Sequence, residues 1–191
     1  MTGDSNSRMS WLDLGEPKIT PEVQAVMDGT RSRLGYVRTG QTIAAHVPDA
    51  MVAQDGLSRG LMLGDGPLSR KERELLALVV SVENRCMTCI FGHASQLRLI
   101  TGDPLWVGEV EANYRHARLT PREMALADYA VKLTRAPGDV REEDLAPLRA
   151  NGISDLGILY TAQIIAYYNF SNRFMSGLGV RPNPESYAAG R

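Results

Sequence analysis

Apolar side chains recur every three or four residues along most of the chain, and this spacing predicts helices. Residues that cap helix starts precede several of these segments. They are Thr20, Ser69, Thr120 and, before the longest segment, Ser154 or Asp155. The predicted helices cover residues 21–34, 41–46, 48–63, 69–82, 121–134, 141–151 and 155–177.

The alternation of apolar and polar residues that marks a half-buried strand is not sustained anywhere in the sequence. Asp-Gly pairs at 55–56 and 65–66 lie between helical patterns, so they do not join two strands. The sequence therefore predicts an all-α fold, a compact bundle of several helices. We expect residues 11–187 to form its single domain, residues 1–10 a flexible tail, and residues 187–191 a short C-terminal tail.

Composition excludes several classes of partner. The 21 basic and 22 acidic residues are scattered, so no electrostatic surface for nucleic acid is expected. The most apolar stretch, residues 158–170, is too short to cross a membrane and contains Gln163 and Asn169. It is predicted to be a buried core helix. No glycine-rich phosphate loop is present, so no nucleotide or other cofactor is indicated.

Cysteine usage indicates the compartment. Two cysteines in 191 residues do not form a secreted disulfide scaffold, and an intracellular protein with one reactive pair fits better. Residues 1–10 lack the apolar region of a signal peptide. The expected location is the cytoplasm.

The candidate chemistry lies in residues 86–93, which hold both cysteines and one of the three histidines. In a helix, Cys86, Cys89 and His93 share one stripe because they are spaced by three and four residues. A pair of thiols beside an imidazole supplies an attacking thiolate, a second thiol for a disulfide, and a proton carrier. Asn84 is a good N-cap, and a helix that starts there places Cys86 at its second position, where the N-terminus favours thiolate. Arg85 adds positive charge.

Two other interpretations of this segment stay open. The cysteines could be structural neighbours in a helical protein without catalytic activity. They could also bind zinc together with His93, with a fourth ligand from Glu83, His46 or His116. A thioredoxin-like role is disfavoured because the βαβ pattern of that fold is missing.

Two stretches of the chain resemble a known family. Residues 68–75 followed by Cys-x-x-Cys-x-x-x-His at 86–93 resemble the alkylhydroperoxidase D-like group of the carboxymuconolactone decarboxylase superfamily. In that group a glutamate stands twelve residues before the first cysteine, and Glu74 has this spacing. Residues 166–173 and 177–180 are similar to a branch of peroxidase-related enzymes. The likeness is close over residues 68–93 and loose over residues 11–187.

The resemblance implies an all-helical homo-oligomer, commonly a trimer or hexamer, that reduces hydroperoxides. By position, Cys89 would attack the peroxide and become a sulfenic acid, and Cys86 would supply a proton and then close the disulfide. Glu74 and His93 would relay protons, and an external dithiol or adaptor protein would restore the thiols. A general dithiol–disulfide reductase with weak peroxidase activity is the alternative within this chemistry. The best-known members have a histidine where this chain has Thr88, which puts efficient peroxide reduction in question.

The role of Glu74 sets a condition on the fold. In one unbroken helix, twelve residues separate Glu74 from Cys86 by about 18 Å. Glu74 can therefore act only if the chain turns within residues 82–85 and the two helices pack antiparallel. Otherwise Glu74 is a solvated charge paired with Arg70 or Lys71, and Glu83 is the nearer carboxylate.

Other polar and aromatic residues have simpler interpretations. His46 is expected at a helix end and His116 at the surface. The aromatic residues at 160, 167, 168 and 170 are expected in the core or in a subunit interface. Asn169, Asn172 and Arg173 lie on an otherwise apolar helix and are expected to bond to loop carbonyls or across an interface.

Overall fold

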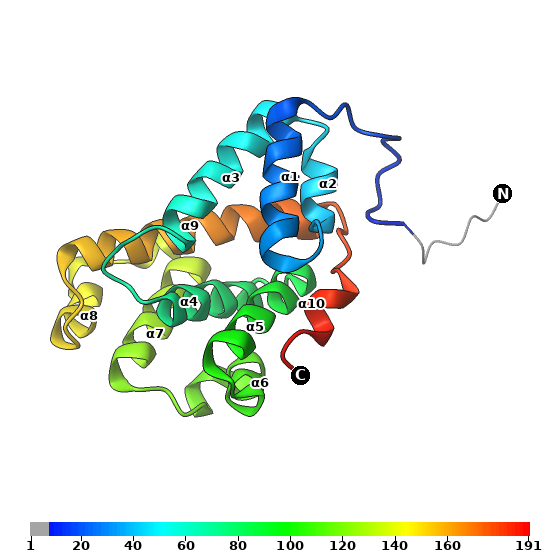
Figure 1. Ribbon diagram of the computed structural model, residues 1–191. Coiled ribbons are helices and arrows are strands. Elements are labelled where there is room, and N and C mark those ends of the chain that lie inside the picture. The colour runs from blue at the N-terminus through cyan, green and yellow to red at the C-terminus, as the bar shows by residue number, and fades with distance from the viewer. Residues whose placement is uncertain (1–7) are drawn as a thin grey trace.

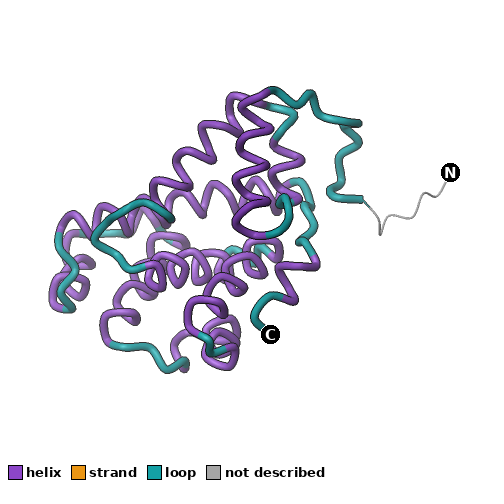
Figure 2. The backbone as a smooth tube through the Cα atoms, in the orientation of Figure 1, coloured by secondary structure: helices purple, strands orange, loops and turns teal. Residues whose placement is uncertain are grey.

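The computed structural model describes residues 8–191, and within that range every regular element is a helix. Figure 2 shows the same arrangement, with helices joined by loops. The α-helices are α1 (Pro21–Leu34), α2 (Thr39–Ala44), α3 (Pro48–Met62), α4 (Arg70–Glu83), α5 (Met87–Thr101), α6 (Pro104–Asn113), α7 (Pro121–Arg135), α8 (Ala146–Ala150), α9 (Asp155–Gly177) and α10 (Pro184–Ala188). Three 3₁₀ helices are η1 (Tyr114–His116), η2 (Pro137–Asp139) and η3 (Glu142–Leu145). The all-α prediction is confirmed over the described residues.

Helix α4 lies at the centre of the fold. Every residue from Glu72 to Ser81 is buried, because α5, α7 and α9 pack around it (Figure 1). A helix that is covered on all sides needs apolar residues around its whole circumference, and the run 75–80 supplies them. The predicted core helix at 158–170 is part of α9, where Ile158, Ile164 and Ile165 are buried.

Helices α1, α2 and α3 form a second layer above α4, α5 and α9 (Figure 1). This layer has its own small apolar cluster, made of Val23, Met27, Ala45 and Met51. This cluster is separate from the main core, which the upper layer joins only at the end of α3, through Leu61 and Met62. The candidate site lies between the two layers.

The predicted helix boundaries agree with the structure where caps define them. Helix α1 starts at Pro21 after Thr20, and α4 starts after the predicted capping box of Ser69 and Glu72. The helix predicted at 41–46 instead occupies Thr39–Ala44. Helix α6, capped by the side chain of Asp103, was missed.

The prediction of a C-terminal tail at 187–191 was wrong. Helix α10 packs on α5, and the buried guanidinium of Arg98 donates to the backbone carbonyls of Ser186, Tyr187 and Ala189. An arginine can fix a loop in this way because its planar group carries five donors. The predicted N-terminal tail is not tested, since residues 1–7 lie outside the described residues. Met9 accepts a backbone hydrogen bond from Arg181.

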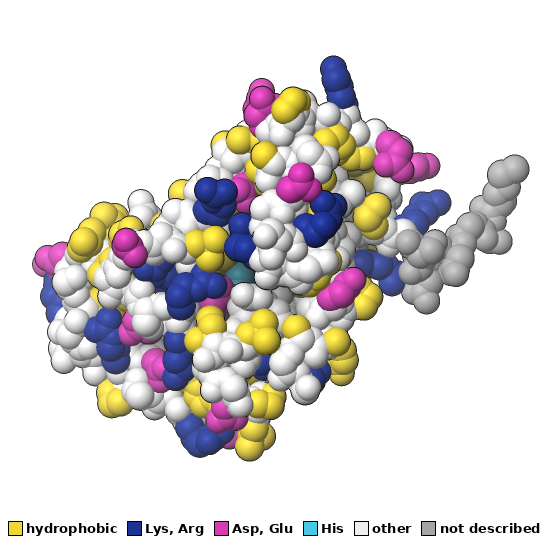
Figure 3. All heavy atoms as spheres, in the orientation of Figure 1, with side chains coloured by type: hydrophobic (Ala, Val, Ile, Leu, Met, Phe, Trp, Pro, Cys, Tyr) yellow, Lys and Arg dark blue, Asp and Glu magenta, His cyan; other side chains and the backbone are white. Residues whose placement is uncertain are grey.

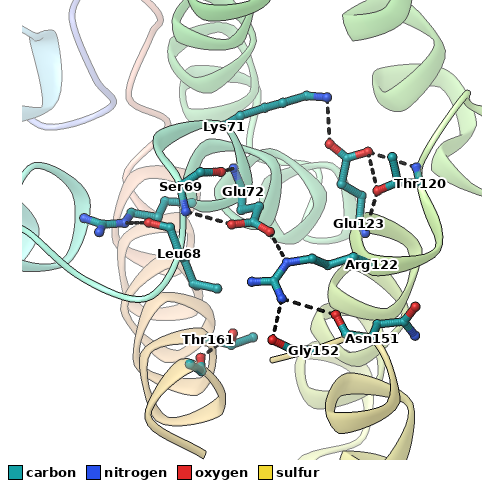
Figure 4. A network of polar contacts seen from close by, with 12 residues as sticks. Leu68, Ser69, Lys71, Glu72, Thr120, Arg122, Glu123, Asn151, Gly152 and Thr161 are labelled. Atoms are coloured by element: carbon teal, nitrogen blue, oxygen red, sulfur yellow. Dashed lines mark hydrogen bonds and ion pairs between the residues drawn. The ribbon is translucent and has the colours of Figure 1, made fainter. Parts of the chain in front are cut away.

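Two capping boxes tie α4 to α7 (Figure 4). Glu72 caps α4 and accepts from Arg122 of α7 at 2.5 Å, while Glu123 caps α7 and pairs with Lys71 of α4 at 2.6 Å. Arg122 also donates to the carbonyls of residues 151 and 152, before α9. Each carboxylate therefore satisfies its own helix start and a cation from the neighbouring helix. This reciprocal arrangement fixes the start of α4.

In the part of the chain that the structure describes, no helix is both long enough and apolar enough to cross a membrane.

The capping carboxylates predict an acid-sensitive fold. Burial is the largest single influence and raises the pKa of Glu72 and Glu123. The hydrogen bonds and charges of Arg122 and Lys71, together with the capping bonds from Ser69 and Thr120, outweigh it in sum, so the pKa of both is lowered. Stability from a lowered pKa is present above the unfolded value, about 4.3, and is lost as the pH falls through the folded value. At neutral pH, we expect the unfolding free energy of the double variant Glu72→Gln/Glu123→Gln to be about 1–3 kcal/mol below that of the wild type. On acidification, the unfolding free energy of the variant should fall less than that of the wild type, because the variant has no carboxylates to protonate at these positions.

Denaturant melts across the acid range measure both effects. Glu16→Gln, which removes an exposed glutamate, is the control and should leave the wild-type curve unchanged. Equal acid sensitivity of the wild type and the double variant would contradict the role of these ion pairs.

Candidate active site

The turn between α4 and α5 brings Glu74 to His93. Glu74 Oε2 lies 2.7 Å from His93 Nδ1, although nineteen positions separate the two residues along the chain. The two helices pack against each other after α4 ends at Glu83 and α5 begins at Met87. The condition that the sequence set for Glu74 is met.

The turn is held by amide side chains. Asn84, the C-cap of α4, donates to Asn169 Oδ1 and Asn172 Oδ1 of α9, both at 3.0 Å. Asn172 in turn donates to Ser81, and Asn169 donates to Thr134. The expectation that the two asparagines and Arg173 bond to loop carbonyls was wrong: the asparagines bond mainly to side chains of α4, α7 and the turn, and Arg173 donates to Asn169. Bonds across a subunit interface stay a prediction. Asn172 is buried and the other two amides are half-buried, so an unmade bond in this network is costly and the network fixes one geometry.

The predicted start of the cysteine helix was wrong by two residues. Asn84 ends α4, and Cys86 itself is the N-cap of α5. Arg85 between them has φ of +53°, a left-handed conformation that is uncommon for a residue with a side chain. Cys86 therefore stands before the first turn of α5, where unsatisfied backbone N–H groups point, and Cys89 stands within that turn.

The two thiols are close and unequal. Cys86 Sγ and Cys89 Sγ lie 2.8 Å apart, and both residues are buried, with 1% and 8% of their surfaces exposed. The Cys89 thiol and the backbone N–H groups at the start of α5 stabilise a negative charge on Cys86, so its pKa falls to about 7 despite burial. The same hydrogen bond to Cys86, together with burial, raises the pKa of Cys89. Above about pH 7 the pair thus holds mainly one proton, on Cys89.

Cys89 and His93 line the same cavity, which lies between the two layers of helices and has a volume of about 120 Å³. Its other walls combine apolar and tyrosine side chains, such as Met51 and Tyr168, with polar and charged ones, such as Arg38. Cys86 does not line this cavity but borders another, more open one of about 370 Å³, which is also lined by Trp11 and shares Met175 with the first. The sulfur pair therefore stands between two cavities.

Tyr168 is a site residue that sequence analysis missed. It was expected in the core or an interface, and it is buried, but its ring meets the His93 ring edge-on with centroids 4.4 Å apart. Burial and the Glu74 charge raise the pKa of Tyr168 well above its usual range, so its hydroxyl stays protonated. Its position on α9 was visible in the sequence, but no local signal tied it to His93.

Glu74 is not a solvated charge. Only 3% of its surface is exposed, and its second oxygen, Oε1, lies 3.4 Å from Arg70. The alternative interpretation was right about the pairing with Arg70 and wrong about solvation. Glu74 orients His93 by holding Nδ1, which leaves the other ring nitrogen free to exchange protons.

Thr88 has a structural partner. Its hydroxyl donates to the backbone carbonyl of Val180, in the segment that follows α9. Thr88 also lines both cavities. In this chain the position thus joins the first turn of α5 to the C-terminal segment.

The fourth ligand that zinc would need is not beside the cysteines. Glu83 pairs with Arg135 of α7, His46 lies between α2 and α3, and His116 is exposed in η1. Among residues 8–191, no three side chains of histidine, cysteine, aspartate or glutamate are grouped to hold a metal ion. The surface position predicted for His116 is confirmed.

The fold and the site define an all-helical protein with a buried dithiol and a half-buried histidine that is held by a buried glutamate. The model of the carboxymuconolactone decarboxylase family matches residues 48–132. A peroxidase-related protein of Silicibacter sp. TM1040 is 32% identical, with 99% of this chain and 100% of that chain covered and a TM-score of 0.92. The alkylhydroperoxidase AhpD core of a peroxidase-related protein of Ralstonia eutropha JMP134 is 31% identical, with 96% and 97% covered and a TM-score of 0.91. The chain belongs to the AhpD-like group of the carboxymuconolactone decarboxylase superfamily.

Both of these relatives are described as uncharacterized, and no curated protein matches the chain. The debrominase Bmp8, solved in complex with 2,3,4-tribromopyrrole, shares the fold at a TM-score of 0.79 and 19% identity, with 94% of this chain and 97% of that chain covered. At this identity the likeness shows a shared fold.

The sulfur geometry predicts an ionisation near neutral pH. Ultraviolet thiolate absorbance of the reduced protein should rise with a midpoint at about pH 7, because the Cys89 thiol stabilises the Cys86 thiolate. In Cys89→Ala this hydrogen bond is lost, and the remaining thiol should titrate closer to its ordinary value of about 8.5. Cys86→Ala is the matched variant, in which Cys89 should titrate above neutral pH. A wild-type midpoint at or above about 8.5 would contradict the proton sharing.

Proposed function

We propose that the protein is a hydroperoxide reductase that uses Cys89, Cys86, His93 and Glu74. One observation carries the proposal. Cys89 and His93 face one cavity, while Cys86 stands 2.8 Å behind Cys89 and Glu74 holds His93. This arrangement offers a nucleophile, a resolving thiol and a proton carrier to a small molecule in the cavity.

The first step is attack of Cys89 on the peroxide. Cys89 passes its proton to the Cys86 thiolate, and its sulfur then attacks the terminal oxygen of the hydroperoxide. The O–O bond breaks, Cys89 becomes a sulfenic acid, and the alkoxide that leaves takes a proton from His93. His93 can carry this proton because Glu74 holds its Nδ1 and fixes the orientation of the ring.

The second step closes the disulfide. Cys86 attacks the Cys89 sulfenic acid and releases water, with the Cys86 proton going to the departing hydroxide. The sum of the two steps converts the hydroperoxide and two thiols into an alcohol, water and a disulfide. An external dithiol then reduces the disulfide by exchange.

The lower pKa of Cys86 does not make it the attacking thiol. Cys86 borders the other cavity, whereas Cys89 shares a cavity with His93. A thiolate on Cys86 acts as the base for Cys89, so the proton that the sequence interpretation assigned to Cys86 is first received from Cys89. The more open cavity at Cys86 favours a second candidate function, dithiol–disulfide exchange with bulky disulfides.

The partner predictions remain proposals. They are a small hydroperoxide, an external dithiol or adaptor protein, assembly into a trimer or hexamer, and a cytoplasmic location. Exposed apolar side chains, such as Phe170 on α9 and Leu99 and Ile100 on α5, are consistent with a subunit interface. Light scattering coupled to gel filtration measures the subunit number.

The cysteine variants test the order of events. With a dithiol donor, both Cys89→Ser and Cys86→Ser should lose multiple turnover of cumene hydroperoxide. Without donor, Cys86→Ser should still consume up to one equivalent and form a sulfenic acid that a dimedone probe traps, whereas Cys89→Ser should form none. Trapping on Cys86 instead would reverse the roles. If the wild type reduces disulfides but no hydroperoxide, the exchange function is favoured.

Glu74 is proposed as the positioning residue for His93. Glu74→Gln should slow hydroperoxide turnover roughly 10- to 100-fold and alter its pH profile, because the carboxylate that holds His93 Nδ1 and orients the ring is lost. Glu83→Gln on the same helix removes a carboxylate that pairs with Arg135, and it should retain turnover. Steady-state kinetics across pH, with melting temperatures of both variants, measure the effect. An unchanged pH profile in Glu74→Gln would show that Glu74 is only structural.

A further inference from the structure

A second cavity, of about 100 Å³, adjoins the one that holds Cys89. The two cavities have a common wall of Arg38, Asp55, Ser58, His93 and Tyr168. A molecule with one end at Cys89 can therefore reach the second cavity past His93. The proposed reaction gives this second cavity no role.

Arginines dominate the second cavity. Four of them line it, Arg33, Arg38, Arg59 and Arg70, against two carboxylates, Asp55 and Glu74. The sequence does not reveal this cluster, because these residues come from the end of α1, the segment before α2, and helices α3 and α4. Within the described residues they form one positively charged group.

Two of these charges have no carboxylate partner. Arg70 lies 3.4 Å from Glu74, and Arg59 lies 4.0 Å from Asp55. Across residues 8–191, by contrast, no carboxylate oxygen lies within 4.0 Å of Arg33 or Arg38. Burial and the positive field of Arg38 lower the pKa of Arg33. Such a cluster attracts an anion, and a guanidinium binds a carboxylate through two parallel hydrogen bonds.

Figure 3 shows the surface above this region. A hollow between the α1–α3 layer and the α4–α5 layer has a histidine side chain at its bottom, and lysine or arginine side chains gather around it. An anion that approaches this face meets positive charge before it reaches the histidine. The field would therefore guide an anion towards the site.

The inner cavity, which Cys89 lines, determines the size and polarity of the part of the ligand that does not bind the arginines. At about 120 Å³ it is close to the roughly 150 Å³ of a protein cavity that accepts benzene, and its lining is mainly apolar. The matching ligand has a compact apolar body in the inner cavity and an anionic group among the arginines.

We propose that the substrate is an organic hydroperoxide that also carries a carboxylate, which binds Arg33 and Arg38 while the peroxide meets Cys89. This inference rests on the proposed function for the peroxide end of the molecule. The carboxylate takes no part in the chemistry: the hydroperoxide gains two electrons from the two thiols and gives an alcohol and water, as above. The arginines select and position the substrate.

Binding of an unreactive product tests the anion site without turnover. The probe is cumyl alcohol with a para-carboxylate, compared with its methyl ester, titrated into the reduced wild-type protein by calorimetry. The acid should bind about tenfold more tightly, the size expected for two partly exposed charge pairs, and added salt should reduce the difference. The double variant Arg33→Gln/Arg38→Gln should bind acid and ester equally.

Arg31→Gln is the matched control. Arg31 is also on α1, but it pairs with Asp28 and does not line the second cavity, so its variant should keep the preference for the acid. Equal binding of acid and ester by the wild type, or an unchanged preference in the double variant, would overturn the anion site. Turnover of para-carboxy cumene hydroperoxide is measured separately. Preference for the acid without any turnover would refute hydroperoxide reduction and retain the anion site.

Discussion

The turn at residues 84–86 is the constraint on which the site depends. Without it, Glu74 and His93 would lie on one long helix or on helices that do not meet. The Asn84 side chain holds the turn by donating to Asn169 and Asn172 of α9. The same contact joins the ends of α4 and α9, so the central helix, the start of α5 and the wall that carries Tyr168 are fixed together. An amide network of this kind specifies one arrangement, because a shifted helix leaves donors unpaired.

The elements that could be predicted from the sequence are those with local signals. Capping boxes at Ser69 and Thr120 fixed two helix starts, since a cap involves residues three apart. The role of Asn84 was misjudged because an asparagine suits either end of a helix, and only its partners on α9 decide which end it closes. The C-terminal helix α10 was missed because the contact that holds it in place is also distant in the sequence. Arg98 holds it from about ninety residues away in the sequence.

The residues of the candidate site also fall into two groups, those that a local sequence pattern reveals and those that only the folded chain brings together. Cys86, Cys89 and His93 are found from spacing within one helix, and Glu74 follows from a resemblance together with one condition on the turn. Tyr168 and the arginine cluster come from separate elements and meet only in the folded chain. Their chemistry depends on that meeting, because a tyrosine or an arginine alone carries no signal of function. Local patterns therefore reveal the reacting atoms, and tertiary packing reveals what surrounds them.

The position of Cys86 at the helix start also bears on how an anionic substrate could approach. In the reduced protein the negative charge lies on Cys86, which borders the other cavity, while Cys89 presents a neutral thiol to the inner cavity. A thiolate on Cys89 would repel a carboxylate-bearing ligand, and burial would strengthen that repulsion. The shared proton meets two requirements at once. The thiol pair is ionised near neutral pH, and the inner cavity through which an anionic substrate enters carries no thiolate and remains positive. Negative charge reaches Cys89 only when its proton passes to Cys86, whose sulfur lies 2.8 Å from that of Cys89, after the substrate has bound.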